Sequence, residues 1–191
     1  VKINLGSEEI KFEQEDPKKA YVTRVYYKKF NNTVKENYKS RLLNSIIDKM
    51  FFDQIREKDN LVYSISASHY YSDFKPMELI SYYMGYGADP DNINEIEKNI
   101  NLILNEVKKG NFDLKIFEDK KLTLINDYKT SLESNSTWLN AIHSADINNL
   151  YLERLMNIET IIKSISKREI VQLAKKYFDG IYFNDIQLIS E

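Results

Sequence analysis

Two side chains, Arg56 and Tyr63, stand seven residues apart at the junction of a predicted helix and a predicted strand. An arginine offers a rigid fork of hydrogen-bond donors that suits carbonyl and carboxylate oxygens. A tyrosine hydroxyl can donate to an oxygen on which negative charge develops during a reaction. Two residues of these types, placed side by side, are suited to binding a peptide.

Both residues also have plain structural interpretations. Arg56 falls on the last turn of the predicted helix. A cation there interacts favourably with the helix dipole and stabilises the helix by about 0.3–1 kcal/mol. Tyr63 shares strand parity with Ile65 and Ala67, which would make it the first residue on the core-facing side of the strand. The residue pattern alone leaves both alternatives open.

The other residues that carry chemistry in many enzymes are few. The sequence has two histidines, His69 and His143, and no cysteine. Neither His-Glu-x-x-His nor its inverse occurs, and in those motifs a helix brings two imidazoles to one face beside a carboxylate. Without cysteine, thiolate catalysis and cysteine zinc sites are excluded. We therefore interpret His69 as a half-buried strand residue and His143 as a helix residue, and we expect no metal ligands in this chain.

The elements that must position Arg56 and Tyr63 follow from the hydrophobic pattern. Thr33 and Glu36 have the spacing of a capping box, which opens a helix that we expect to run to about Lys58. Asp59 and Asn60 can end this helix because both tolerate left-handed backbone angles. Two strand-like runs follow and read as an antiparallel hairpin, over residues 61–72 and 77–87.

The remaining segments complete one fold class. Further strands are expected at the N-terminus, around 10–14, over 20–27 and over 181–189. Helices are expected over 93–109, 113–133 and 137–152, and after a second capping box that begins at Ser166. This order predicts an α+β domain, a largely antiparallel sheet with helices packed on one face.

Length and charge narrow the classes of partner. The chain has 191 residues, a size typical of one domain, and its 27 basic and 29 acidic residues give a net charge of −2. Nucleic-acid binding is disfavoured because it depends on a basic face. No apolar run is long enough for a membrane span, so we expect no membrane insertion. Because residues 1–5 begin with Val and read as a strand, we expect a fragment of a two- or four-domain protein, and the richness in Lys, Asn and Ile suggests a bacterial source.

One stretch is specific enough to suggest a family. Residues 52–67, Phe-Asp-Gln-Ile-Arg-Glu-Lys-Asp-Asn-Leu-Val-Tyr-Ser-Ile-Ser-Ala, resemble the non-zinc, C-terminal-type domain of the pitrilysin/insulinase metallopeptidases, the inverzincins. In that family a helix ends in Leu-Arg-Glu-Lys and a strand opens with Tyr-Ser after a small turn. The order of the other predicted elements fits the same domain over nearly the whole chain. Asp59-Asn60 stands where the family commonly has Gly-Gly.

The resemblance implies a role in peptide hydrolysis. It implies that Tyr63 steadies the tetrahedral intermediate as an oxyanion donor and that Arg56 binds the substrate backbone. Zinc and the general base would come from another domain, the N-terminal half of the same protein or a partner subunit, so this segment alone would be inactive and would close the chamber. The alternative is a non-catalytic scaffold subunit of the same fold. The sequence does not distinguish a location in the bacterial cytoplasm from one in the periplasm.

Overall fold

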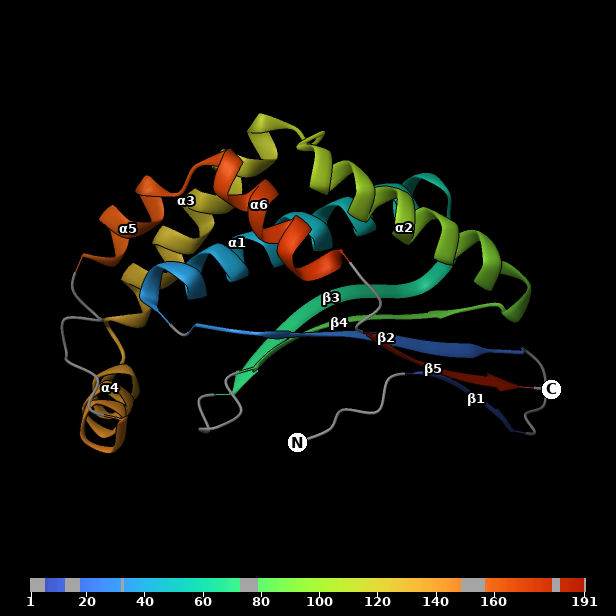
Figure 1. Ribbon diagram of the computed structural model, residues 1–191, viewed down its shortest axis with the longest axis horizontal. Helices are drawn as coiled ribbons and strands as arrows, with labels where there is room; N and C mark the ends of the chain where they lie inside the picture. Colours follow the sequence, from blue (N-terminus) through green and yellow to red (C-terminus); the bar gives the residue numbers. More distant parts are fainter. Residues whose placement is uncertain are drawn as a thin grey trace.

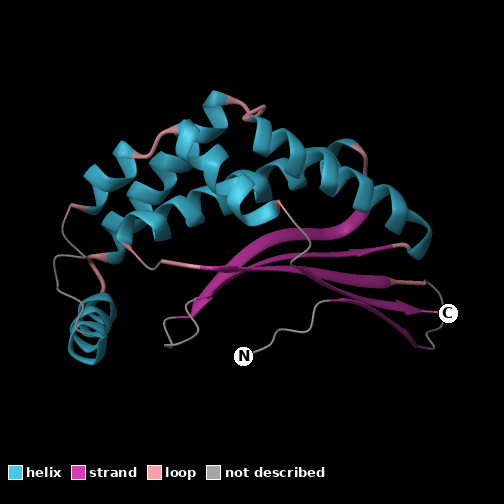
Figure 2. Ribbon diagram, viewed as in Figure 1, coloured by secondary structure: helices cyan, strands magenta, loops and turns pink. Residues whose placement is uncertain are grey.

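The computed structural model describes residues 6–12, 18–31, 33–72, 79–148, 157–179 and 183–190. In this part of the chain, helices form one layer over a sheet (Figures 1 and 2). The strands are β1 (Gly6–Phe12), β2 (Ala20–Lys29), β3 (Val62–Ser72), β4 (Leu79–Ala88) and β5 (Phe183–Ser190). The helices are α1 (Val34–Phe51), the π-helix η1 (Phe52–Lys58), the 3-10 helix η2 (Pro90–Asn92), α2 (Ile93–Lys109), α3 (Leu114–Ser131), α4 (Asn135–Asn148), α5 (Ile158–Ser164) and α6 (Lys167–Phe178).

The sheet has the strand order β1-β5-β2-β4-β3. Strand β1 runs parallel to β5, whereas the β5–β2, β2–β4 and β4–β3 pairs are antiparallel. The predicted α+β class, with a largely antiparallel sheet and helices on one face, is therefore confirmed. Strand β3 lies at an edge of the sheet, next to the end of the helix that carries Arg56. The strand predicted at residues 1–5 lies outside the described residues.

The two faces of the sheet differ because side chains alternate along a strand. On β2, Val22 and Tyr26 are buried under the helices, and the ring of Tyr26 meets Phe178 of α6 edge-on, with centroids 5.2 Å apart. Tyr21 points the other way and is 50% exposed, beside Leu188 of β5 in the sheet register. Within the described residues, the helices cover only one of these faces (Figure 1).

Helix α1 is the central helix of the layer because its apolar stripe faces the sheet and the neighbouring helices. Its N-cap, Thr33, accepts a hydrogen bond from the backbone N–H of Glu36 at 3.2 Å. The stripe is fully buried and consists of Leu42, Leu43, Ile46, Ile47 and Phe51. The second predicted capping box is present at Ser166 and Glu169, and it opens α6.

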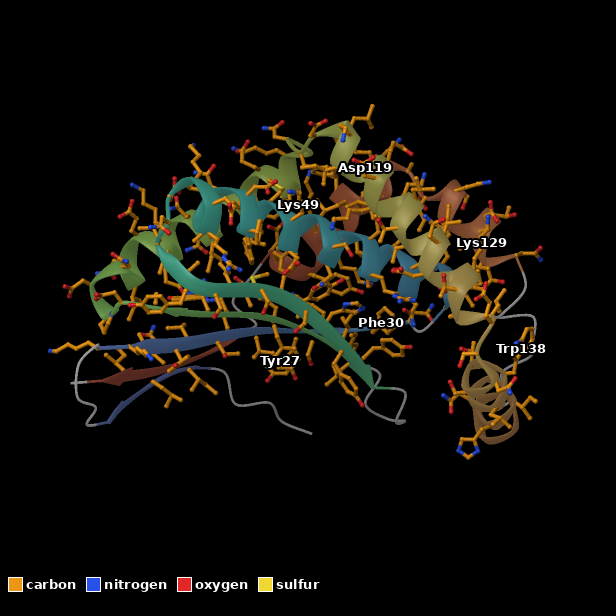
Figure 3. The ribbon with its side chains drawn as sticks, turned by 180° about the vertical axis from the view of Figure 1, so that it is seen from behind. Tyr27, Phe30, Lys49, Asp119, Lys129 and Trp138 are labelled. Carbon is orange, nitrogen blue, oxygen red and sulfur yellow. The ribbon has the colours of Figure 1, made fainter. Side chains whose placement is uncertain are left out.

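Two helices depart from the predicted pattern. Helix α5 was not predicted, because its seven residues are too few for a periodic signal. Helix α4 begins at Asn135, two residues before its predicted start, and stands beside the sheet rather than over it, with Trp138 on it (Figure 3). Its predicted end, at about Leu152, lies outside the described residues. No helix in the described ranges has the length and apolar character that a membrane crossing requires.

Candidate functional site

Arg56 lies in a widened helical segment that continues α1. Residues Phe52–Lys58 form the π-helix η1, which ends where the sequence predicted the helix to end. The backbone N–H of Asp59 donates to the carbonyl of Gln54 at 3.0 Å, five residues back, which is the π-helical spacing. Such π-turns are rare and frequently occur at functional sites.

The guanidinium of Arg56 sits on the surface of this segment. Arg56 is exposed, and its guanidinium carbon lies 5.3 Å from the ring centroid of Phe52, one turn earlier. This cation–π contact with Phe52 is the interaction that Arg56 makes among the described residues. No carboxylate in the described part of the chain pairs with Arg56. The donors of Arg56 are therefore available to a ligand, and its position in the last turn of η1 also suits the helix dipole.

The turn after η1 takes the left-handed conformation that the sequence predicted. Asn60 has φ of 52°, in the region that Asn tolerates better than most residues. The backbone N–H of Leu61 then donates to the carbonyl of Ile55 at 3.1 Å, which closes the end of the helix. The chain reverses at Asn60 and enters β3 at Val62.

Tyr63 occupies an irregular position at the start of β3. Val62 pairs with Ala88 and Ser64 pairs with Gly87, so Tyr63 is an extra residue with no partner on β4. A bulge of this kind changes the direction of a side chain and often occurs beside active sites. Tyr63 is 56% exposed, whereas Val62 is 7% exposed.

The structure decides between the two interpretations for Tyr63, whereas Arg56, exposed in the last turn of η1, fits both of its interpretations. The interpretation of Tyr63 as a core residue is wrong, because the bulge breaks the alternation that linked it to Ile65 and Ala67. Ala67 is buried and Ile65 packs against the core, as the same alternation predicted. Arg56 and Tyr63 are both exposed, at the two ends of a single short connection.

His69 is the half-buried strand residue that the sequence predicted. Its ring stacks on that of Tyr82 with centroids 5.7 Å apart. Burial, and then the positive charge of Arg41, lower the pKa of His69 from 6.5 to about 4. The imidazole is therefore neutral at ordinary pH and belongs to the packing between β3 and β4.

His143 lies on α4 and is exposed, far along the chain from His69. Among the described residues there is no group of three or more His, Asp or Glu side chains that could hold a metal ion.

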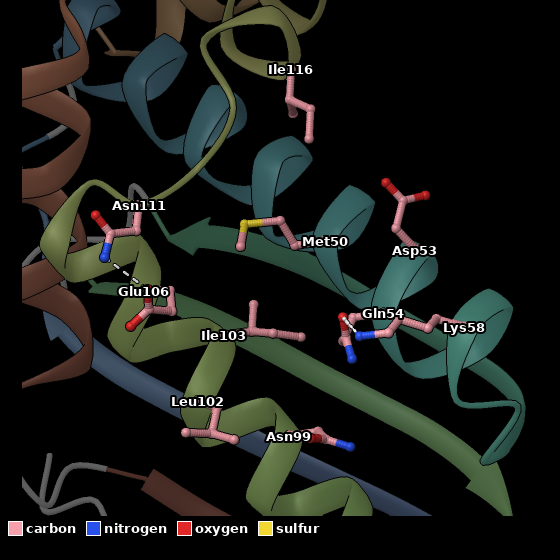
Figure 4. Close-up of a pocket in the computed structure, with 10 residues that line it drawn as sticks. All are labelled: Met50, Asp53, Gln54, Lys58, Asn99, Leu102, Ile103, Glu106, Asn111 and Ile116. Carbon is pink, nitrogen blue, oxygen red and sulfur yellow. Dashed lines mark hydrogen bonds between the residues drawn. The ribbon is translucent and has the colours of Figure 1, made fainter.

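A separate pocket of about 500 Å³ lies between η1 and α2 (Figure 4). Its lining combines apolar side chains with carboxylates and amides: Met50, Asp53, Gln54, Lys58, Asn99, Leu102, Ile103, Glu106, Asn111 and Ile116. Several polar groups in it pair with each other, for example Asn111 Nδ2 with Glu106 Oε2 at 2.8 Å. Neither Arg56 nor Tyr63 lines this pocket, so it is not the site that the sequence predicted.

The residues that support the Arg56–Tyr63 connection were missed by the sequence reasoning. Asp59 was recognised only as a helix stop, yet its carboxylate accepts hydrogen bonds from Gln54 and Asn99. Asn99 lies 40 residues further along the chain, on α2. Nothing in the residue pattern signals a bond over that separation, and only the packing of α2 against η1 brings the groups together.

Comparison with known proteins supports the family that residues 52–67 suggested. The family described as the peptidase M16 inactive domain matches residues 3–124. No curated protein sequence matches the chain.

Solved structures share the fold at low sequence identity. The periplasmic protease PqqL from Escherichia coli superposes with a TM-score of 0.79 at 14% identity, over 98% of this chain and 21% of that one. The ferredoxin protease FusC, solved with Arabidopsis ferredoxin, gives 0.78 at 14% identity, over 100% of this chain and 21% of that one. A peptidase M16 inactive domain from Pseudomonas fluorescens gives 0.75 at 15% identity, over 95% of this chain and 43% of that one.

This chain therefore spans between about one fifth and two fifths of these structures. The family match covers β1 to β4, the η1 turn and the helices as far as the first part of α3. The domain described above, with its exposed Arg56 and Tyr63, belongs to the family of peptidase M16 inactive domains.

Proposed function

We propose that this domain is the substrate-contacting, chamber-closing half of a zinc-dependent metalloendopeptidase, in which another domain supplies the zinc and the general base. The observation that carries the proposal is the position of Tyr63, which the bulge lifts out of the strand pairing and leaves 56% exposed. A tyrosine that serves packing would have its aromatic ring buried in the core. An exposed hydroxyl at a fixed point of the backbone is suited to contact a substrate.

Tyr63 and Arg56 would act on different oxygens of the peptide. The Tyr63 hydroxyl donates a hydrogen bond to the carbonyl oxygen as negative charge develops on it. Arg56 donates to the backbone carbonyls beside the cleaved bond. Its contact with the Phe52 ring, at 5.3 Å, limits the freedom of the guanidinium before substrate binds, which lowers the entropy lost on binding.

The metal would act from the partner. Two histidines and a glutamate on a zinc-bearing half, with a further glutamate as general base, are the ligand set that the family resemblance implies. Zinc bound there would lower the pKa of its water ligand and polarise the scissile carbonyl. The present domain holds the peptide against that centre and adds the donor that faces the oxyanion.

The test is peptide hydrolysis by the assembled protein, with this domain and the zinc-bearing half together. Tyr63→Phe removes only the hydroxyl, and kcat falls by about 10² to 10³, the usual cost of losing one oxyanion donor. Arg56→Ala raises KM more than it lowers kcat. Tyr70→Phe is the matched control, because Tyr70 is an exposed tyrosine on the same strand, 65% exposed.

Cleavage at the parental rate by both the Tyr63 and the Arg56 variants would overturn the proposal. A partner half without zinc ligands would instead support the scaffold alternative.

A further inference from the structure

The turn between Arg56 and Tyr63 is held by one carboxylate. Asp59 Oδ2 accepts a hydrogen bond from Gln54 Nε2 at 3.0 Å and another from Asn99 Nδ2 at 3.3 Å. Gln54 belongs to η1 and Asn99 to α2, so a single oxygen atom connects the turn to both helices. All three residues are partly buried.

The backbone of the turn is bonded at the same places. The N–H groups of Asp59 and Leu61 donate to carbonyls of η1, at 3.0 and 3.1 Å. The carbonyl of Leu61 accepts from Asn92 Nδ2 at 3.2 Å. Asn60, the residue between them, has the positive φ of 52° that the reversal needs. Each residue of the turn is thus fixed by a hydrogen bond or by its backbone conformation.

Arg56 and Tyr63 are placed by this fixed turn. Arg56 lies within both backbone rings that the Asp59 and Leu61 bonds close, because those rings begin at Gln54 and Ile55. Tyr63 follows Leu61 by two residues and has no partner of its own on β4, but its neighbours Val62 and Ser64 pair there. The turn and the β4 pairing of these two neighbours therefore together hold its backbone.

We propose that Asp59 is a positioning residue, which acts through Arg56 and Tyr63 and fixes where their donors lie relative to each other. The inference rests on the proposed function. Asn99 and Gln54 hold Asp59 in place, and both are accessible from the pocket between η1 and α2 (Figure 4). Misplacement of a catalytic group by about 1 Å can cost 10²-fold in rate, so the loss of this anchor is expected to be measurable.

The experiment measures kcat and KM of the assembled protein on one peptide. Asp59→Ala lowers kcat/KM by about 10-fold to 10²-fold. Asp59→Asn retains most of the activity, because its amide oxygen can still accept from Gln54 and Asn99. Asp53→Ala is the matched control: Asp53 is another carboxylate of η1, but it pairs with Lys49 at 2.5 Å and does not hold the turn.

A background that lacks both donors separates a positioning role of Asp59 from a general loss of activity through damage to the fold. In protein that already carries Arg56→Ala and Tyr63→Phe, Asp59→Ala is expected to have no further effect on kcat/KM, because there is nothing left to position. An equal loss in both backgrounds would overturn the inference. So would a parental rate for Asp59→Ala in the background with Arg56 and Tyr63 intact.

If Asp59→Ala does not fold, Asn99→Ala decides by the same comparison, since it removes one donor to the carboxylate and leaves the turn sequence unchanged. A loss of activity with Tyr63→Phe but none with the Asp59 and Asn99 variants would sink this inference alone. Parental activity for both Tyr63→Phe and Arg56→Ala would sink the proposed function as well.

Discussion

The carboxylate of Asp48 on α1 accepts a hydrogen bond from the backbone N–H of Ala67 on β3, at 2.8 Å. Asn44, one turn earlier on α1, donates to the carbonyl of the same residue at 2.9 Å. Both backbone groups of Ala67 are therefore bonded to a helix, in the middle of a strand that forms an edge of the sheet. Exposed edges invite pairing with another chain, and α1 closes this one at Ala67.

We expect Asp48→Ala to lower the free energy of unfolding by about 1–3 kcal/mol, because it leaves the Ala67 N–H without its charged acceptor. Urea denaturation of the chain measures the change. Ser45→Ala is the control, since the Ser45 hydroxyl donates within α1, to the carbonyl of Arg41 at 2.9 Å. Equal losses for the two variants would show that the bond to the edge strand contributes nothing.

Lys121 is a buried lysine with a structural task. Its side chain is on α3, the residue is 9% exposed, and Nζ donates to the carbonyls of Lys163 and Ile165, each at 3.0 Å. Lys121→Met keeps the apolar stem and removes the donors, so we expect a loss of about 1–3 kcal/mol in unfolding free energy. Lys115→Met, at a lysine whose side chain is 80% exposed, should change stability little. No difference between the two variants would contradict the assignment.

The lowered pKa of His69 predicts a pH dependence of stability. The folded chain binds the proton with a pKa of about 4 instead of 6.5, so protonation favours the unfolded chain. The contribution is complete above pH 6.5 and is lost as the pH falls from there towards 4.

Thermal unfolding at pH 7 and pH 5 tests this dependence. We expect the melting temperature of the parental chain to drop over this interval by more than that of His69→Phe, which keeps an aromatic ring against Tyr82. His143→Ala is the comparison variant, because His143 lies exposed on α4. Parallel pH profiles for the parental chain and His69→Phe would show that another group is responsible.

The sequence was sufficient for the features that rest on local chemistry. The helix end at Lys58, the left-handed Asn60 and the capping box at Ser166 each follow from residue types with a known local preference. The burial of Ala67 and the half-buried state of His69 follow from strand alternation.

The features that the sequence did not reveal depend on a single extra residue or on distant contacts. The π-turn of η1 and the bulge at Tyr63 each add one residue to a regular element, and no residue type marks either of them. The bonds of Asn99 to Asp59 and of Lys121 to the end of α5 join residues about 40 positions apart. These contacts exist because helices pack together, which a local pattern does not encode.

The widened winding of η1 has a consequence for how the chain can change. A regular helix turns by about 100° per residue, so deletion of one residue between Phe52 and Lys58 would swing every later side chain of that segment around the axis. Substitutions there are open to gradual selection, whereas deletion of one codon before Arg56 would re-aim the guanidinium in one step. The number of residues in η1 before Arg56 is thus constrained as much as the choice of residue types.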